Sequence, residues 1–174
     1  DKGICYSVND NPTIDDQRIS GGPGVGSFLC TLTGLEENET YYVCAYAVNS
    51  MGVSYGIKKS FTTQGRPVIS TVNVSNVSAN RAQCSGNVSS EGGSPVSERG
   101  VCYGLAPNPT INNDVVKCGT GTGSFTCDLP NLSNNTTYYV KAYAKNSFGV
   151  AYGVEMHFTT ELFPIFQYGG HIYQ

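Results

Sequence analysis

Residues 137–146 read TYYVKAYAKN, and residues 40–49 read TYYVCAYAVN. Both segments belong to one internal repeat, because an offset of 97 positions aligns Gly3 with Gly100 and continues without a gap to the FTT motif that ends each copy. About half of the aligned positions are identical, which is far more than shared composition produces. A period of about one hundred residues is too long for a solenoid and is typical of tandem β-sandwich domains.

The second copy carries seven segments with the pattern of short β-strands. Apolar and polar residues alternate along them, turn sequences rich in Gly, Asn and Pro separate them, and no segment has the periodicity of an α-helix. The segments cover residues 68–78, 81–90, 97–104, 115–118, 124–132, 137–146 and 150–160. Seven such strands predict an all-β fold, and specifically an immunoglobulin-like β-sandwich.

The first copy begins at the third of these strands, so it lacks its two N-terminal strands. We expect an N-terminally incomplete repeat at 1–63, a linker at 64–67, a complete repeat at 68–160, and a tail or the start of a following domain at 161–174. We expect upstream residues of the same polypeptide to complete the first repeat. The alternative is a strand donated by another chain, which would make the protein part of a homo-assembly.

The composition of the chain excludes several classes of function. The net charge is −3, and ten Lys and Arg residues are scattered among thirteen acidic ones, so no nucleic-acid surface is expected. No apolar run approaches the roughly 20 residues that cross a bilayer. Seven cysteines favour an oxidising compartment, and hence an extracellular or cell-surface location.

The sequence does not indicate a metal site, a cofactor or an enzyme. Zinc sites need close ligand pairs, whereas the chain has no CxxC motif and its two histidines, His157 and His171, are isolated. A catalytic thiol would need a base beside it, and the GTGTG sequence at 119–123 lacks the Lys and Ser/Thr of a phosphate loop. The loops at 9–16 and 106–114 offer Asp and Asn oxygens to calcium, but such residues more often cap their own backbone.

The segment LSNNTTYYVKAYAKN at 132–146 is similar to the sixth strand of fibronectin type III domains. The longer pattern ERGVCYG…NPTI…GTGTGSFTCDL…LSNNTTYYVKAYAKNSFGVAYG…FTT resembles fibronectin-III-like repeats of secreted bacterial surface proteins. This resemblance covers about residues 1–160, and it implies that Tyr138 and Tyr41 form tyrosine corners, in which the hydroxyl bonds to nearby backbone. It also implies spacers or adhesive modules beside other domains of the same polypeptide.

The tail ELFPIFQYGGHIYQ leaves the repeat after Thr160. Its YGGHIY motif at 168–173 loosely resembles the opening strand of C-type-lectin-like domains that follow such repeats. A plain linker is an equally good interpretation of so short a segment.

The strand order of the resembled family, combined with period-2 alternation, implies a disulfide scheme for the second copy. Cys84 and Cys127 would face inward on neighbouring strands and form one bond. Cys102 would face outward and pair with Cys118, which ends the adjacent strand. The alternative is that these cysteines are free thiols that serve as small hydrophobic residues.

The same resemblance implies a different pairing in the first copy. Cys5 and Cys44 would face outward on adjacent strands and form a disulfide. Cys30 would stay unpaired in this chain, because it is the equivalent of Cys127 and its partner would lie on a missing strand. Free thiols are again the alternative.

Exposed aromatic side chains are the candidate ligand contacts. Tyr42 and Tyr46 in the first copy, and Tyr139 and Tyr143 in the second, are predicted to point outward from one strand. Exposed tyrosines can stack on sugars or anchor proteins, so a glycan or a protein at a cell surface is a candidate partner. The alternative is that these rings cover the open face of the sheet.

Seven Asn-x-Ser/Thr sequons are candidate glycosylation sites in a eukaryotic secretory pathway, and are incidental in a bacterial protein. They are Asn38, Asn73, Asn76, Asn87, Asn131, Asn134 and Asn135.

Together these observations predict a non-enzymatic extracellular protein whose tandem repeats act as a structural spacer or adhesion module. One alternative is a binding module that recognises glycan or protein through its tyrosines and loops. Another is a subunit of a surface filament that is completed by strand donation.

Overall fold

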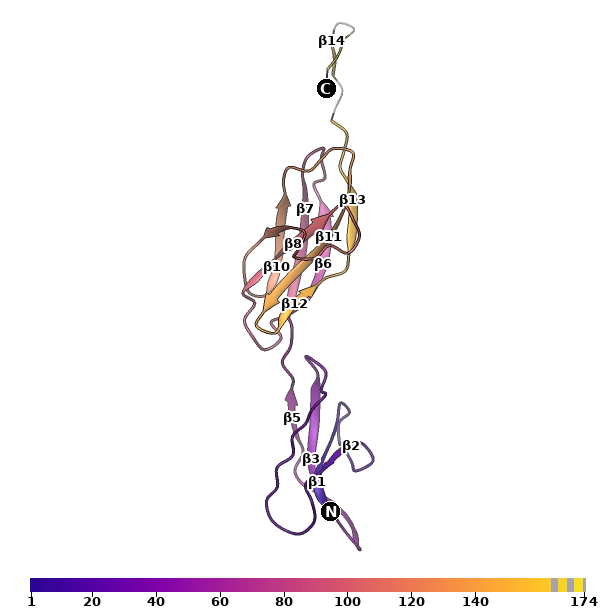
Figure 1. The fold of residues 1–174 in the computed structure, drawn as a ribbon, viewed down its shortest axis with the longest axis vertical. Coiled ribbons are helices and arrows are strands. Elements are labelled where there is room, and N and C mark those ends of the chain that lie inside the picture. Colours follow the sequence, from indigo (N-terminus) through magenta and orange to yellow (C-terminus); the bar gives the residue numbers. More distant parts are fainter. Residues whose placement is uncertain (164–165, 169–170, 174) are drawn as a thin grey trace. The chain divides into compact units, whose positions relative to one another are not determined.

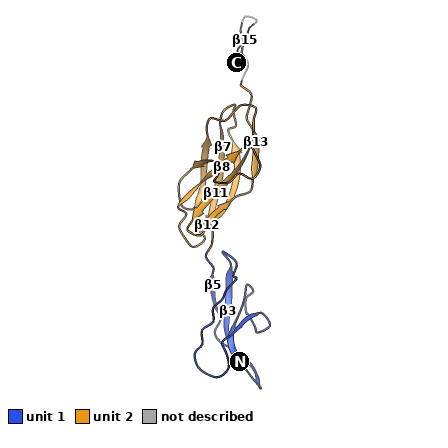
Figure 2. Cartoon of the chain, viewed as in Figure 1, with its two compact units in different colours: residues 1–64 blue, residues 65–174 orange. Residues whose placement is uncertain are grey.

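A computed structural model describes residues 1–163, 166–168 and 171–173 (Figure 1). These residues form only strands, turns and loops, so the prediction of an all-β fold is confirmed. They contain no helix that is long and apolar enough to cross a membrane. The chain divides into two compact units, unit 1 at residues 1–64 and unit 2 at residues 65–174 (Figure 2).

Unit 1 is one antiparallel sheet in the order β2-β1-β3-β4, in which β5 also pairs with β3. Its strands are β1 (Lys2–Ser7), β2 (Gln17–Ser20), β3 (Thr40–Asn49), β4 (Gly52–Tyr55) and β5 (Lys59–Thr62). The ten-residue β3 is central, since β1 pairs with one of its edges and β4 and β5 pair with the other. Its sequence, TYYVCAYAVN, is rich in Tyr and Val, which favour strands, and contains no Gly or Pro that would end the strand.

Unit 2 has two facing sheets, one in the order β10-β7-β6 and the other in the order β12-β11-β8-β9 with β13 also paired to β11. The strands are β6 (Val68–Ser75), β7 (Ala82–Ser90), β8 (Glu98–Gly104), β9 (Asp114–Lys117), β10 (Gly123–Leu129), β11 (Thr137–Asn146), β12 (Gly149–Tyr152) and β13 (Met156–Thr159). This strand order is that of a fibronectin-III-like sandwich, and the fold prediction is confirmed.

In the tail, β14 (Phe166–Tyr168) and β15 (His171–Tyr173) form an antiparallel pair. The predicted lectin-like YGGHIY motif falls partly outside the described residues, at positions 169–170.

The last predicted strand, 150–160, is interrupted in the structure because it is divided into β12 and β13. At the break, the Gly153 N–H donates to the Ala142 carbonyl at 2.9 Å. The Ala142 N–H instead donates to the Thr71 hydroxyl of β6 at 3.0 Å. Thr71 of the facing sheet thus accepts the Ala142 N–H, which a continuous strand along this edge of β11 would otherwise have accepted. The hydrogen-bond ladder between β11 and the last strand is therefore interrupted at Ala142.

The core of unit 2 lies between its two sheets. Inward side chains of β11, namely Val140, Ala142 and Ala144, are each 0% exposed and belong to one buried cluster. Phe125 of β10 and Cys84 of β7 join this cluster from the facing sheet. The cluster is contiguous, so burial of these side chains is the main force that holds the two sheets together.

Both predicted tyrosine corners are present. The Tyr138 hydroxyl accepts the Ser133 N–H at 3.0 Å, and the Tyr41 hydroxyl accepts the Glu36 N–H at 3.1 Å. Each contact spans five residues of sequence and fixes the loop that leads into the central strand of its unit. The role that the family resemblance implied for these two tyrosines is confirmed.

Unit 1 has only one sheet, which corresponds to the β12-β11-β8-β9 sheet of unit 2. Among the described residues, no sheet faces it in unit 1, so the inner face of β3 is partly open. Ala47 is exposed, whereas its equivalent Ala144 is fully buried. Phe61 is 38% exposed, compared with 8% for its equivalent Phe158. The first repeat therefore lacks its two N-terminal strands in the structure, as the sequence predicts.

The absent sheet also changes a segment that is present in both copies. Residues 123–129, GSFTCDL, form β10 and pair along their whole length with β7. Residues 26–32, GSFLCTL, align with them but are not in a strand. A strand needs a partner for its backbone groups, and among the described residues the equivalent of β7 does not exist in unit 1.

Candidate functional site

Two of the four candidate contact tyrosines are buried. Tyr46 is 3% exposed and Tyr143 is 0% exposed, so the prediction that they form an accessible outer surface is wrong. Each hydroxyl donates to an acidic side chain at the start of the neighbouring strand. Tyr143 reaches Glu98 Oε1 at 2.8 Å, and Tyr46 reaches Asp1 Oδ2 at 2.9 Å.

Glycines on the neighbouring strand explain why these rings are buried. Gly100 is the register partner of Tyr143, as Gly3 is of Tyr46. A Cβ atom at Gly100 would lie 3.1 Å from the Tyr143 ring and 2.1 Å from the Val116 carbonyl oxygen. The ring therefore occupies space that only glycine leaves free. The glycine that both copies carry at this position, Gly3 and Gly100, is the signal in the sequence from which this packing could have been predicted.

Glu98 links this tyrosine to a third strand. Lys117 Nζ of β9 lies 2.6 Å from Glu98 Oε2. The Lys117 ammonium and the Tyr143 hydroxyl together hold the pKa of the Glu98 carboxyl below its ordinary value of 4.5. Burial, followed by the hydrogen bond to Glu98, raises the pKa of Tyr143. These three side chains satisfy one another and fasten β8 to β9 and β11.

Tyr42 and Tyr139 are half-buried and are the part of the predicted tyrosine surface that stays accessible. Both rings already have neighbours within their own unit. The Lys58 ammonium lies 5.6 Å from the centroid of the Tyr42 ring. The Tyr139 ring is tilted against His157, with 6.1 Å between ring centroids.

The cysteine pairing predicted for unit 2 is wrong. Cys118 and Cys127 form the disulfide, and their Cα atoms are 5.9 Å apart. Cys84 and Cys102 are free and buried, although Cys84 is the register partner of Cys127. Cys118 follows β9 directly, and β9 contacts β10, so Cys118 lies beside Cys127.

The thiol of Cys102 is buried on the outer side of its sheet, under a loop. It donates to the carbonyl oxygens of Pro109 and Lys141, each at 3.5 Å. Burial raises the pKa of Cys102 to about 11 and that of Cys84 to about 12. Both thiols are therefore protonated at neutral pH and act as small hydrophobic side chains.

Cys5 and Cys44 in unit 1 are both free thiols. They are register partners on β1 and β3, and they are 0% and 6% exposed. The predicted disulfide between them is not formed, and their outer face is covered rather than exposed. Cys30 is free and half-buried, and its thiol donates to the Ile19 carbonyl at 3.7 Å.

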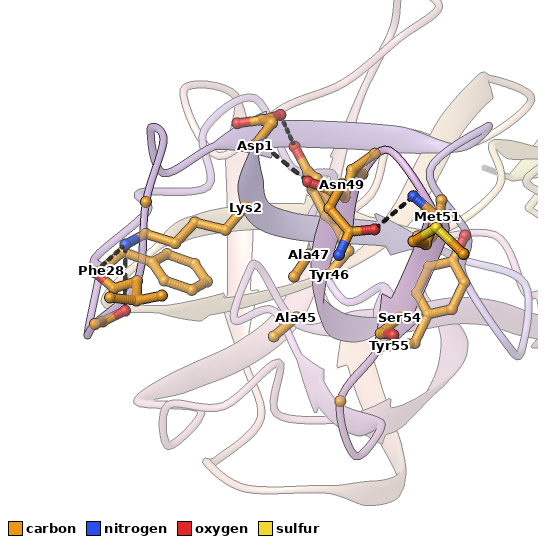
Figure 3. A pocket seen from close by; sticks show the side chains of 17 residues that line it. Asp1, Lys2, Phe28, Ala45, Tyr46, Ala47, Asn49, Met51, Ser54 and Tyr55 are labelled. Carbon is orange, nitrogen blue, oxygen red and sulfur yellow. Dashed lines mark hydrogen bonds between the residues drawn. The ribbon is translucent and has the colours of Figure 1, made fainter.

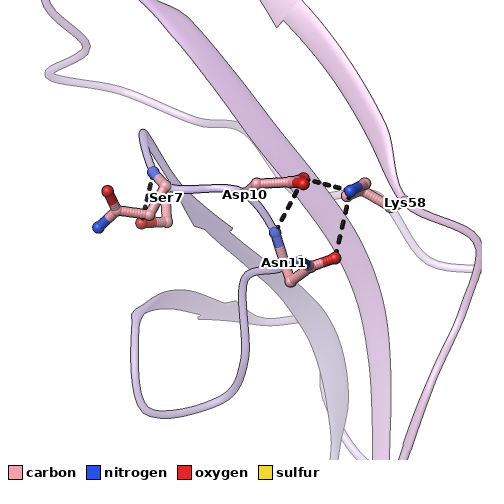
Figure 4. Close-up of polar contacts among 5 residues, drawn as sticks. Ser7, Asp10, Asn11 and Lys58 are labelled. Atoms are coloured by element: carbon pink, nitrogen blue, oxygen red, sulfur yellow. Dashed lines mark hydrogen bonds and ion pairs between the residues drawn. The ribbon is translucent and has the colours of Figure 1, made fainter.

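The Asp- and Asn-rich loops cap their own backbone, as the alternative to calcium binding predicts. Asp16 Oδ2 accepts the Thr13 N–H at 2.8 Å, and Asn113 Oδ1 accepts the Thr110 N–H at 2.9 Å. Lys58 holds the first loop through Asp10 and Asn11 (Figure 4). Within the described part of the chain, no three His, Cys, Asp or Glu side chains are grouped as a metal site would require.

The seven sequons lie mostly on the surface. Asn87 on β7 is half-buried and the other six are exposed. Four of them have positive φ angles, which places them in tight turns. These four are Asn38, Asn76, Asn131 and Asn135. Glycosylation at any of the seven remains a prediction.

A groove of about 830 Å³ lies along β3 and β4 of unit 1 (Figure 3). Ala45, Ala47 and Phe28 line it, and their equivalents in unit 2 belong to the buried core. Lys2 Nζ donates to the carbonyl oxygens of Val25 and Gly26 at 3.2 Å each, which anchors the loop beside Phe28. The groove is thus lined by side chains that a second sheet covers in the other repeat.

No protein-family model matches the chain, and no curated protein matches it. Among solved structures, it is similar to the sensor domain of the anti-sigma factor RsgI4 of Pseudobacteroides cellulosolvens, with 19% identity over 57% of this chain and 98% of that one and a TM-score of 0.44. It is also similar to domains FN1–FN3 of chicken CNTN1, with 17% identity over 92% of this chain and 56% of that one and a TM-score of 0.46. A third similarity is to the sixth fibronectin type III domain of human fibronectin type III domain containing protein 3, with 22% identity over 61% of this chain and 91% of that one and a TM-score of 0.39. The fold assignment itself rests on the strand order and pairing within this chain.

Proposed function

We propose that the chain is a non-enzymatic extracellular spacer built of fibronectin-III-like repeats. The observation that carries this proposal is that the motifs shared by both copies make contacts within their own unit. The corner tyrosines bond to backbone, Tyr46 and Tyr143 are buried against glycine, and the Asn-Pro loops are capped internally. The repeated residues thus stabilise the fold, as expected of a module whose role depends on its length and folded structure. The Cys118–Cys127 disulfide is consistent with an extracellular location.

A surface-display experiment tests the spacer role. The chain is placed between a membrane anchor and an epitope tag on a cell, and antibody access to the tag is measured. We expect an unrelated β-sandwich of similar length to replace residues 65–160 without loss of access. A Gly/Ser linker with the same number of residues is expected to give less access, because a flexible chain collapses to a much shorter mean length. Equal access with the flexible linker would contradict the proposal.

Adhesion through Tyr42 and Tyr139 is the competing proposal, and the same cells distinguish it. Binding to a glycan array or to host cells is measured for the natural chain and for a Tyr42→Ala, Tyr139→Ala variant. If the chain is a spacer, the natural chain, the double variant and the chain with the unrelated β-sandwich should all give the same binding. Binding that only the natural chain supports would favour the adhesive module.

A second candidate function is that unit 1 accepts a β-hairpin, and the open groove along β3 favours it. In unit 2 the β6–β7 hairpin occupies the corresponding place and pairs with β10. The Leu132 N–H donates to the Asn80 carbonyl at the end of this hairpin. Asn146 Nδ2 donates to the Gly65 carbonyl at 2.8 Å and to the Glu91 carbonyl at 2.7 Å, on either side of the hairpin.

Phe125 also packs against Gly86 of this hairpin, and unit 1 retains all three residues. Leu35, Asn49 and Phe28 are identical to their equivalents Leu132, Asn146 and Phe125. Asn49 is exposed, whereas Asn146 is 3% exposed. This retention supports a hairpin with the sequence pattern of residues 68–90 as the occupant. We propose that this hairpin belongs to the same polypeptide and precedes Asp1.

Duplicating residues 65–97 in front of Asp1 tests this candidate, because it reproduces the spacing of unit 2. We expect the fused chain to be monomeric and residues 26–32 to gain strand-like hydrogen-exchange protection. A matched fusion with Val88→Asp in the added hairpin should lose both effects, because it places a charge at a core position. A natural chain that already forms stable dimers with residues 26–32 protected would instead indicate donation by a second copy.

A further inference from the structure

The outer face of unit 1 holds two thiols side by side. Cys5 and Cys44 are register partners in the antiparallel pair of β1 and β3. The Cys5 thiol donates to the Cys44 carbonyl at 3.3 Å, and the Cys44 thiol donates to the Gly56 carbonyl at 2.9 Å. Register partners have Cα atoms about 4.5–5.5 Å apart, which lies within the range of about 4.4–6.8 Å that a disulfide spans.

Unit 2 provides a comparison in which this pair cannot form. Cys102 is the equivalent of Cys5, but its register partner is Lys141. Lys141 Nζ donates to Asn108 Oδ1 at 3.1 Å and so supports the Asn-Pro loop. A cysteine at position 141 would remove the lysine side chain that holds the Asn-Pro loop of unit 2.

In unit 1 that support comes from another position. Lys58 Nζ donates to Asn11 Oδ1 at 3.2 Å, and Asn11 is the equivalent of Asn108. Lys58 itself is the equivalent of Glu155, so the charge at this position is reversed between the copies. Unit 1 therefore keeps a lysine on the Asn-Pro loop although position 44 carries a thiol. Unit 1 differs from unit 2 at both positions, Cys44 in place of Lys141 and Lys58 in place of Glu155, and the second difference compensates for the first.

Both thiols are buried, but Cys44 borders a small pocket at the surface. A surface pocket of about 250 Å³ is lined by Cys44 together with Pro12, Gly56 and Lys58. Burial, followed by the neighbouring Cys44 thiol, raises the pKa of Cys5, which makes Cys5 less reactive than an ordinary thiol. A small oxidant that enters this pocket would therefore meet Cys44 first, beside the Lys58 ammonium, which is ion-paired with Asp10.

We propose that Cys5 and Cys44 form a redox-active dithiol that a low-molecular-weight disulfide such as oxidised glutathione converts into a cross-strand disulfide. The Cys44 thiolate attacks one sulfur of the glutathione disulfide, and one glutathione thiolate leaves. The Cys5 thiolate then attacks Cys44 Sγ and displaces the second glutathione thiolate. Two cysteine thiols are oxidised, one glutathione disulfide is reduced to two thiols, and the two protons pass to the departing glutathione.

This bond would join the two central strands of unit 1, which has a single sheet to hold it together. Closing the loop from Cys5 to Cys44 restricts the unfolded chain, so the oxidised form should unfold at a higher temperature by several degrees. The inference does not depend on the spacer function, because it concerns a modification of unit 1.

The test is a redox titration of the full chain carrying Cys30→Ser. In this variant the tryptic peptides 3–18 and 19–58 each hold one cysteine. The chain is equilibrated with oxidised and reduced glutathione, quenched in acid, alkylated, digested without reductant, and analysed by mass spectrometry. We expect the two peptides to be joined, with a mass two hydrogens below their sum, in a fraction that rises with the share of oxidised glutathione.

The variant Cys44→Lys in the same background copies unit 2 and should leave Cys5 alkylated at every ratio. The joined form should also melt several degrees above the reduced form. The proposal is overturned if both cysteines are alkylated at every ratio while Cys118–Cys127 stays oxidised. It is also overturned if Cys44 accumulates as the glutathione adduct without joining Cys5.

Discussion

At the scale of single residues, Gly100 determines how the outer face of unit 2 is packed. Its missing side chain leaves room for the Tyr143 ring, and this position lets the Tyr143 hydroxyl reach Glu98. Gly3 and Tyr46 repeat the arrangement in unit 1. A glycine that weakens a strand by itself is therefore compensated by the burial of a large aromatic ring.

Replacing this glycine should destabilise unit 2. In Gly100→Ala, the new Cβ would lie 2.1 Å from the Val116 carbonyl oxygen, which belongs to the backbone and cannot move easily. We expect the free energy of unfolding to fall by about 1–3 kcal/mol, as in other overpacked sites. Gly104→Ala on the same strand is the control, since its nearest atom, Asn113 Nδ2, would be 3.9 Å away. Equal losses in the two variants, measured by denaturant unfolding, would contradict this account.

The carboxylate of Glu98 should make unit 2 sensitive to acid. Its folded pKa lies below 4.5, so ionised Glu98 stabilises the folded state above that value. The contribution is lost as pH falls below 4.5 through the folded pKa. The difference in unfolding free energy between the natural chain and Glu98→Gln should therefore be largest near neutral pH and shrink in acid. A difference that stays constant from pH 7 to pH 3 would exclude the ion pair with Lys117 as its source.

At the scale of elements, similar sequences have different structures or surroundings in the two units. GSFTCDL is a strand beside β7, whereas GSFLCTL at 26–32 is not in a strand. TYYVCAYAVN and TYYVKAYAKN both form ten-residue strands, because both have partners on their two edges. Local propensity is thus sufficient only where a neighbour receives the backbone hydrogen bonds.

Hydrogen exchange should separate β3 from β11 despite their similar sequences. β11 is covered by β6 and β7, whereas the inner face of β3 lines an open groove. We expect the amides of residues 40–49 to exchange at a lower opening free energy than those of residues 137–146 in the same sample. Peptide-level mass spectrometry of the natural chain measures both together. Equal protection would indicate that the inner face of β3 is covered in solution.

At the scale of the whole molecule, each unit holds its own hydrophobic cluster. The large cluster that fills unit 2 contains only residues of unit 2, and the small cluster of Cys5, Cys44 and Tyr46 lies within unit 1. The larger cluster buries far more apolar surface, so unit 2 should be the more stable unit.

Residues 65–174 alone should therefore unfold at the same denaturant midpoint as the second transition of the full chain. The full chain should show a first transition at lower denaturant, in which β3 loses its structure. Intrinsic tyrosine fluorescence and hydrogen exchange follow the two steps. A single transition in the full chain, at a midpoint that the fragment does not share, would show that the units depend on each other.

The amino-acid sequence by itself determined the repeat, the strands and the corner tyrosines, because alternation, turn residues and internal identity are local properties. It also located Cys5, Cys44, Cys84, Cys102 and Cys127 and the candidate tyrosines on the correct strands, whereas Cys30 is not in a strand and Cys118 lies just after β9. Only the tertiary structure decided that Tyr46 and Tyr143 are buried, since a glycine on the neighbouring strand leaves room for each ring. It likewise decided that Cys127 bonds to Cys118 rather than Cys84. Alternation predicts which face of a strand a side chain points from. The choice of Cys127 between the two nearby cysteines, Cys84 and Cys118, depends on where the chain after β9 places Cys118.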